Sequence, residues 1–267
     1  MQPRGKSLFS LTGKSILVTG AYGYLGRAMV SDLARAGAHV FVNGRSPEKC
    51  LAMAAEVREL GFSASAAAFD VTDDEQVARF FEDLDGAPLD GLVNNAFSGR
   101  GGTIETLTET AYGEAYEVTV TSAHRLIRAG LPNLRQAAAQ SGYASVVNVA
   151  SMYGLVSPVH RNYGHPDQTN PPSYGAAKAG LIQFTRYAAC EFGHEFVRIN
   201  ALAPGPFPSD VVRGADPGFV DRLALSVPMR RVGDAQELSG PVIFLLSEAS
   251  SFVNGAILSV DGGWTSW

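Results

Sequence analysis

The chain has 267 residues, of which 46% are hydrophobic and 18% are charged. This composition supplies enough apolar material for one large core and excludes a disordered ground state. The formal net charge is −5, from 21 basic and 26 acidic residues, and no dense run of lysine or arginine occurs, so a nucleic-acid partner is excluded as well.

Cys50 and Cys190 are the only cysteines, too few for a disulfide framework or a cysteine-based zinc site. No apolar stretch approaches the ~18 residues of a membrane span. The first residues, 1–6, lead into no apolar segment of the kind found in secretory signals. We therefore expect a cytoplasmic protein with no membrane partner.

Short apolar runs alternate with helical patterns along the chain. The predicted strands are Ser15–Thr19, His39–Val42, Ala66–Phe69, Gly91–Val93, Ser145–Ala150, Val197–Ala201 and Ala256–Val260. The predicted helices are Tyr24–Ala36, Pro47–Leu60, Asp73–Leu84, Tyr112–Leu131, Tyr174–Phe192 and Ala235–Leu246. Strands that are apolar on both faces and separated by helices predict a parallel sheet covered on both sides. We expect a Rossmann-like, doubly wound α/β fold, with residues 1–267 forming a single domain.

Three glycines follow the first strand at intervals of three residues, Gly20, Gly23 and Gly26. In a dinucleotide-binding turn, one glycine makes the tight bend, one admits the pyrophosphate and one lets helix and strand pack closely. The helix that starts here offers free N–H groups and a partial positive charge to phosphates. The expected cofactor contacts are Gly20, Tyr22, Gly23, Tyr24, Leu25 and Gly26. The alternative is a glycine-rich turn that serves geometry alone.

The end of the second strand decides which nicotinamide cofactor is preferred. A carboxylate there would bind an unmodified adenine ribose and repel a 2′-phosphate. The chain instead has Arg45 and Ser46, and an arginine can bond a phosphate through two nitrogens. The sequence therefore favours NADP over NAD, unless Arg45 is only a solvated surface residue.

Tyr174 and Lys178 lie four residues apart near the start of a predicted helix, on one face. Lowering the pKa of a phenol from ~10 to near 7 requires about 4 kcal/mol, which an ammonium and an oxidised nicotinamide can provide together. Ser151 follows the fifth strand, where ligands of parallel sheets gather, and its hydroxyl can hold a substrate oxygen beside the phenol. The alternatives are a solvated helix face and a strand-end cap.

With these motifs in order, the chain resembles the short-chain dehydrogenase/reductase family in its single-domain branch. The likeness runs from Leu11 to Gly263 and also includes Asp70-Val71, Asn94-Asn95-Ala96, Asn200 with Pro204-Gly205, and Asp261-Gly262-Gly263. The resemblance implies hydride transfer between nicotinamide and a carbonyl carbon, with Tyr174 as acid/base. It implies that Lys178 binds the nicotinamide ribose and lowers the pKa of Tyr174, and that Ser151 polarises the carbonyl.

The same resemblance assigns further cofactor contacts and an oligomeric state. Asp70 and Val71 would border the adenine, Asn94 and Ala96 would line the groove, and Pro204, Gly205 and Ser209 would lie beside the nicotinamide. Family members suggest a homodimer or homotetramer assembled through the helices around Tyr112–Leu131 and Tyr174–Phe192.

Two positions and one spacing depart from the family pattern. Tyr24 stands where this branch usually has its second glycine, and the spacing of Gly20, Gly23 and Gly26 resembles the branch that acts on sugar nucleotides. Thr119 stands where a catalytic asparagine is common, so we expect its hydroxyl to replace that side chain, or another anchor for a proton relay. Tyr174 follows Ser151 by 23 residues, about twice the usual spacing, which indicates an insertion within Val156–Pro172.

The insertion would lie beside the reacting carbonyl. Its polar residues suit an oxygen-rich or anionic substrate, such as a sugar derivative or a carboxylated metabolite; they are His160, Arg161, Asn162, Tyr163, His165, Asp167 and Gln168. No helix fixes the histidines at a metal-ligand spacing, so we expect no metal. The alternatives for this segment are a surface loop and a subunit contact. Another irregular stretch is predicted over Pro204–Pro217.

The leading hypothesis is an NADP-dependent oxidoreductase that acts on a carbonyl or secondary alcohol of a small polar metabolite. A second hypothesis is a cofactor-binding regulatory protein without chemistry, although such a protein has no use for Ser151, Tyr174 and Lys178. A third is an epimerase or dehydratase that uses the cofactor transiently, which the glycine spacing suggests.

Overall fold

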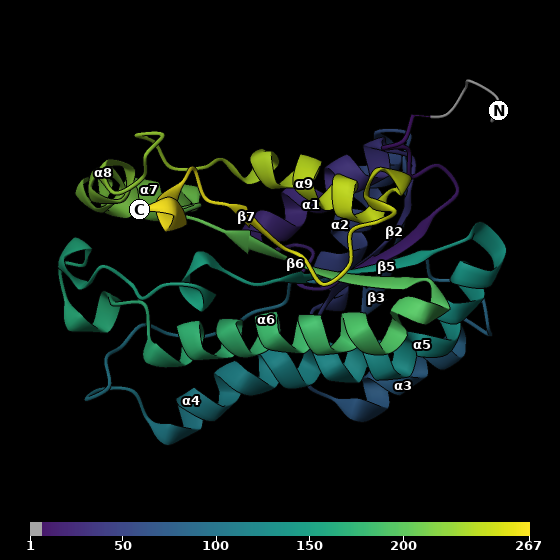
Figure 1. The fold of residues 1–267 in the computed structure, drawn as a ribbon, viewed down its shortest axis with the longest axis horizontal. Coiled ribbons are helices and arrows are strands. Elements are labelled where there is room, and N and C mark those ends of the chain that lie inside the picture. Colours follow the sequence, from purple (N-terminus) through teal and green to yellow (C-terminus); the bar gives the residue numbers. More distant parts are fainter. Residues whose placement is uncertain (1–6) are drawn as a thin grey trace.

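The computed structural model describes residues 7–267 (Figure 1). The first six residues, for which the sequence predicts no secretory signal, lie outside the described residues. Within the described part, seven parallel strands form one sheet in the order β3-β2-β1-β4-β5-β6-β7. The strands are β1 Ser15–Val18, β2 His39–Gly44, β3 Ser63–Ala68, β4 Gly91–Asn94, β5 Ala144–Val149, β6 Val197–Pro204 and β7 Ile257–Val260. The predicted doubly wound fold is confirmed.

Helices cover both faces of the sheet (Figure 1). They are α1 Tyr24–Arg35, α2 Pro47–Glu59, α3 Asp74–Asp83, α4 Glu109–Tyr116, α5 Ser122–Ser141, α6 Pro172–Phe192, α7 Asp210–Ala215, α8 Pro217–Leu225 and α9 Ser239–Leu246. One face carries α1, α2 and α9, and the other carries α3 to α6. Each face has its own apolar core, because successive strand residues point to opposite sides. In β1, Ile16 and Val18 belong to the first core and Leu17 to the second.

The helix predicted over Tyr112–Leu131 is wrong at both ends. It begins at Glu109, contains a π-helical turn at Glu117–Thr121, and continues as α5 to Ser141. Pro132 is exposed inside α5, while buried apolar residues lie on both sides of it. Their burial outweighs the backbone hydrogen bond that proline cannot donate. Gly142, at a φ of 88°, ends the helix instead.

The irregular stretch predicted over Pro204–Pro217 is also wrong. It contains α7, and the sequence reading missed α8 directly after it. The side chains of Ser209 and Asp216 accept hydrogen bonds at the two helix starts, so local capping organises a segment with little apolar periodicity. In Figure 1, α7 and α8 lie above the sheet near its β7 edge.

Other elements begin or end a few residues from the prediction. The largest differences are three residues: β6 ends at Pro204, and β3 starts at Ser63 because it pairs with β2 residue by residue from His39 onward. The predicted helix over Ala235–Leu246 begins as a 3₁₀ turn at Ala235–Leu238 and continues as α9. Within residues 7–267, no helix combines the length and the apolar character needed to cross a membrane.

The sheet topology fixes where ligands bind. Strand β1 lies between β2 and β4. After β1 the chain adds β2 and β3 on one side of β1, and after β3 it crosses to add β4 on the other side. Loops at the carboxyl ends of these strands separate there and leave a crevice. The glycine turn, Arg45 and the residues after β4 all border this crevice.

Candidate active site

The glycine turn between β1 and α1 has the geometry expected of a phosphate-binding turn. Gly20 has a φ of 60°, which side chains disfavour, and a Cβ on it would lie 3.0 Å from the Ala96 Cα. A Cβ on Gly26 would lie 2.3 Å from the Gly20 carbonyl oxygen, so helix and turn touch there. Gly23 is exposed and starts α1 without a side-chain cap, which leaves the first N–H groups of the helix for a ligand.

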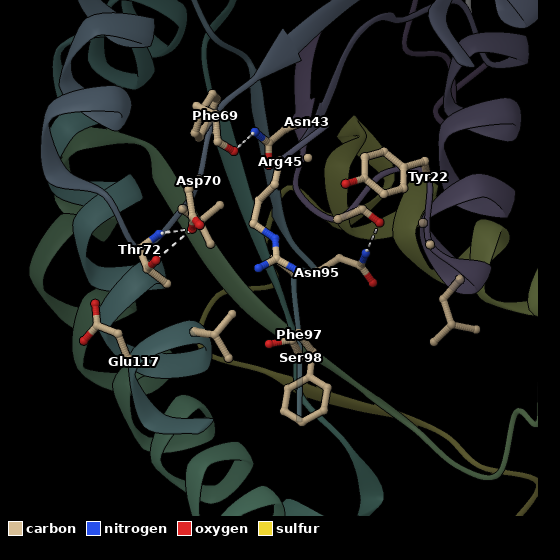
Figure 2. A pocket seen from close by; sticks show the side chains of 18 of the residues that line it. Tyr22, Asn43, Arg45, Phe69, Asp70, Thr72, Asn95, Phe97, Ser98 and Glu117 are labelled. Atoms are coloured by element: carbon tan, nitrogen blue, oxygen red, sulfur yellow. Dashed lines mark hydrogen bonds between the residues drawn. The ribbon is translucent and has the colours of Figure 1, made fainter. Parts of the chain in front are cut away.

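A cleft of about 680 Å³ opens from this turn (Figure 2). Ten of the predicted cofactor contacts line it: Gly20, Tyr22, Gly23, Tyr24, Leu25, Gly26, Arg45, Asp70, Val71 and Ala96. The Asp70 carboxylate accepts hydrogen bonds from the backbone and hydroxyl of Thr72, at 2.9 and 2.7 Å. These bonds hold Asp70 in one orientation at the edge of the cleft, where Figure 2 shows it.

Arg45 reaches into the cleft from the end of β2 (Figure 2). It is exposed, and no carboxylate among residues 7–267 forms a salt bridge with it. Ser46 caps α2, its backbone N–H donates to the Tyr22 hydroxyl at 3.3 Å, and it does not line the cleft. The guanidinium is therefore free to bind an anion at this end.

Five other predicted cofactor contacts lie outside the cleft, Lys178, which is described below, and four that are each held by a structural contact. Asn94 is buried and donates to the Asn148 side chain at 2.8 Å, joining β4 to β5. Pro204 ends β6, and a Cβ on Gly205 would lie 2.5 Å from the Asp261 Cα. Ser209 caps α7. Nothing in these contacts depends on a ligand.

Lys178 is buried, with 3% of its surface exposed. Its Nζ donates to the Val149 carbonyl at 2.6 Å, and it lies 5.6 Å from the ring centre of Tyr174 and 5.5 Å from that of Phe97. No carboxylate among residues 7–267 pairs with it. Burial therefore lowers the pKa of Lys178 from 10.5 to about 7.

Tyr174 stands on the same helix face, as the four-residue spacing predicts. The ammonium lies over its ring rather than beside its hydroxyl. Burial raises the pKa of Tyr174, and the hydroxyl of Ser151 opposes that effect by hydrogen bonding to the phenol. The expectation that Lys178 lowers this pKa is thus not met in this arrangement, because the Nζ is turned toward the Val149 carbonyl.

Ser151 has the capping role that the sequence left open, and its position is compatible with the substrate-binding role. It follows β5 and caps the 3₁₀ turn Met152–Gly154, and its oxygen accepts the Tyr153 N–H at 3.1 Å. The Ser151 hydroxyl can still donate its own proton, and its hydrogen bond to Tyr174 lowers the pKa of that phenol. The side chain is 5% exposed, so a ligand oxygen bound here would be largely shielded from water.

Thr119 lies in the π-helical turn between α4 and α5. Single π turns within α-helices are frequent at functional sites. The Thr119 hydroxyl is buried and has no hydrogen-bond partner within residues 7–267. A buried hydroxyl without a partner is costly, which fits a group reserved for a water or a ligand.

Sequence reasoning missed Phe97, the residue after Asn94-Asn95-Ala96. Its ring meets the Tyr174 ring edge-on at 4.9 Å, and it is 40% exposed. Phe97 and Ser98 end the cleft on the side of Tyr174, and Ser151, Tyr174 and Lys178 do not line the cleft itself. The sequence feature that could have indicated Phe97 is a large aromatic residue directly after Asn94-Asn95-Ala96.

The insertion meets its prediction only in part. His160, Arg161, His165, Asp167 and Gln168 are exposed, because they lie on the outer side of two 3₁₀ turns, His160–Asn162 and Pro166–Gln168. His165 and Asp167 lie 3.5 Å apart, and within residues 7–267 no three metal-binding side chains gather. Asn162 and Tyr163 point inward. Of the predicted polar set, these two residues alone are turned into the protein, while His160 and Arg161 border two other clefts.

A family model described as Enoyl-(Acyl carrier protein) reductase matches residues 20–265. The match covers most of the chain, from the glycine turn to the C-terminal segment. The chain therefore belongs to the short-chain dehydrogenase/reductase family, as its motifs predict. The prediction of a dehydrogenase or reductase is supported by the same finding.

Individual relatives are similar over nearly their whole length. A rhamnolipids biosynthesis 3-oxoacyl-[acyl-carrier-protein] reductase of Pseudomonas aeruginosa is 32% identical, over 96% of this chain and 98% of its own. A gluconate 5-dehydrogenase of Gluconobacter oxydans is 33% identical, over 97% of each. The structure of a gluconate 5-dehydrogenase from Burkholderia cenocepacia with NADP and tartrate superimposes with a TM-score of 0.86 at 30% identity, covering 97% of this chain and 98% of that one.

Proposed function

We propose that this protein is an NADP-dependent oxidoreductase that interconverts a carbonyl and a secondary alcohol in a small polar metabolite. The observation that carries the proposal is the buried, uncompensated Lys178 beside Tyr174 and Ser151. A buried lysine without a charged partner destabilises the fold, and a costly ionisable group close to a binding cleft is typical of a functional site.

The cleft fits a dinucleotide. The positive φ of Gly20 and the close contact at Gly26 are what a pyrophosphate-binding turn requires, and α1 presents its first N–H groups there. Arg45 is suited to a 2′-phosphate, and no acidic residue follows β2 to favour an unmodified ribose. When bound, NADP supplies or accepts the hydride.

The chain's own residues supply the proton and the orientation. In the direction of reduction, Tyr174 donates its hydroxyl proton to the carbonyl oxygen, and Ser151 donates a hydrogen bond to that oxygen. Lys178, whose Nζ lies near the rings of Phe97 and Tyr174, is suited to bind the nicotinamide ribose. The unpartnered hydroxyl of Thr119 is suited to anchor a water that returns a proton to this site.

The substrate class follows from the surroundings and from relatives. Tyr153 packs in the same apolar cluster as Tyr174 and Leu223 of α8, and its hydroxyl hydrogen-bonds that of Tyr163. The relatives include gluconate 5-dehydrogenases, one with tartrate bound, so a sugar-derived or carboxylated substrate is the natural class for this site.

The test is to replace Tyr174 by phenylalanine and to follow NADPH consumption with a panel of keto acids, ketoses and ketones. Loss of the acid should lower kcat by at least ~10²-fold while NADPH still binds. Tyr187→Phe is the matched control, because Tyr187 lies on the same helix and is 65% exposed. It should turn over like the wild type.

Three results would contradict the proposal. Full turnover in Tyr174→Phe removes the tyrosine from the chemistry. NADPH binding without consumption across the panel favours a regulatory protein. Product formation with no net change in NADPH favours an epimerase or dehydratase.

A further inference from the structure

The insertion places a second phenol next to one that belongs to the core of the site. The hydroxyls of Tyr153 and Tyr163 lie 3.2 Å apart and hydrogen-bond to each other. Tyr153 follows Ser151 by two residues and is buried, and its ring meets Trp264 edge-on at 6.4 Å. Tyr163 comes from the middle of the insertion.

Tyr163 is held in place by contacts with α8. Its ring packs on Phe219, with ring centres 5.3 Å apart. The neighbouring Asn162 donates to the Ser226 hydroxyl at 3.2 Å, and its carbonyl accepts from Arg222 at 2.7 Å. These contacts join the insertion to α8 and to the turn that follows α8. They fix the position of Asn162 and Tyr163 beside the site.

Tyr153 belongs to the apolar cluster against which Tyr174 packs, and Tyr163 reaches that cluster through its contact with Phe219. That cluster contains Tyr153, Leu223, Val227 and Trp264, with Tyr174 and Phe219 packed against it. The three tyrosines are close enough to influence one another, because Tyr163 raises the pKa of Tyr174 and Tyr174 raises that of Tyr153. A ligand whose oxygen contacts Tyr174 therefore has its neighbouring atoms near the pair.

The chemistry of the pair selects the group that it can bind. Two hydroxyls that share one hydrogen bond retain one donor proton and free acceptor lone pairs. Burial raises the pKa of both phenols, so both stay protonated and neutral near pH 7. Arg222, the nearest cation in these contacts, is bonded to the Asn162 carbonyl. A neutral hydroxyl, which both donates and accepts, matches this arrangement better than a carboxylate does.

We propose that Tyr153 and Tyr163 form a substrate subsite that binds a hydroxyl group on the carbon next to the reacting carbonyl. The subsite selects hydroxyketones, the arrangement found in keto sugars, over simple ketones. This inference rests on the proposed ketone reduction and names the part of the substrate that the insertion recognises.

Hydroxyacetone and butanone test the subsite, because they differ only in a hydroxyl in place of a methyl group. The assay compares kcat/KM for the two ketones with NADPH, using the full-length wild type and Tyr163→Phe. We expect the ratio of hydroxyacetone to butanone to fall about tenfold in the variant, since one hydrogen bond is lost. The value for butanone itself should change by less than about threefold.

Tyr153→Phe removes the other hydroxyl and leaves the contacts between the insertion and α8 in place, and it should lower the ratio in the same way. Tyr187→Phe should leave the ratio unchanged. If the ratio is unchanged in both tyrosine variants, including the case in which kcat/KM falls equally for both ketones, the subsite is overturned and the proposed reduction stays intact. A wild type that reduces neither ketone but does reduce a keto acid overturns the subsite alone, and one that reduces nothing in the whole panel of keto acids, ketoses and ketones overturns the proposed reduction and the subsite with it.

Discussion

Lys178→Met should make the protein more stable and inactive. The wild type holds an ammonium in an apolar site with one hydrogen bond, and this environment lowers its pKa from 10.5 to about 7. At about 1.36 kcal/mol per pKa unit, keeping this group folded at pH 7 costs about 4 kcal/mol relative to an unperturbed lysine. Methionine has a similar length and no charge to desolvate.

Part of that gain is lost because the Val149 carbonyl loses its donor. A buried acceptor without a partner costs about 1–3 kcal/mol. The net stabilisation of the cofactor-free variant at pH 7 is therefore about 1–3 kcal/mol. It is measured as the difference in unfolding free energy from urea titrations of the two proteins.

The pH dependence gives a sharper measurement, since it isolates the lysine. The folded pKa lies below the unfolded one, so between pH 7 and 10.5 the unfolded chain binds the extra proton and wild-type stability rises with pH. From pH 7 to pH 9 the wild type should gain roughly 2 kcal/mol more than Lys178→Met. A variant that is less stable at pH 7, or whose pH dependence parallels that of the wild type, refutes the reasoning.

Two further predictions concern the cleft. Arg45→Ala should raise KM for NADPH about tenfold or more and leave KM for NADH nearly unchanged. The reason is that a charge-assisted bond to the 2′-phosphate is worth about 1.5–3 kcal/mol. Equal changes in KM for both cofactors would show that Arg45 does not bind the 2′-phosphate. Phe97→Gly removes the ring that ends the cleft beside Tyr174. It should speed NADPH association in stopped-flow fluorescence, and an unchanged or slower rate would mean that the ring does not obstruct the nicotinamide end.

The alternation of apolar strands and helices is a local property, and it was sufficient to predict the fold. Seven strands, their parallel arrangement and the glycine turn all follow from spacing that the chain carries in short segments. The pairing of Tyr174 with Lys178 is local as well, because four residues make one helical turn. Each of these features depends on neighbours in sequence, which is why the sequence alone determined them.

Other features depend on contacts between distant segments, and only the tertiary structure decided them. The helix continues past Pro132 because burial on both sides outweighs one missing hydrogen bond. Lys178 turns to the Val149 carbonyl, and Phe97 lies against Tyr174, and both contacts join residues that are far apart in the sequence. The insertion turns most of its polar side chains outward and Tyr163 inward, because its inner side must pack on α8.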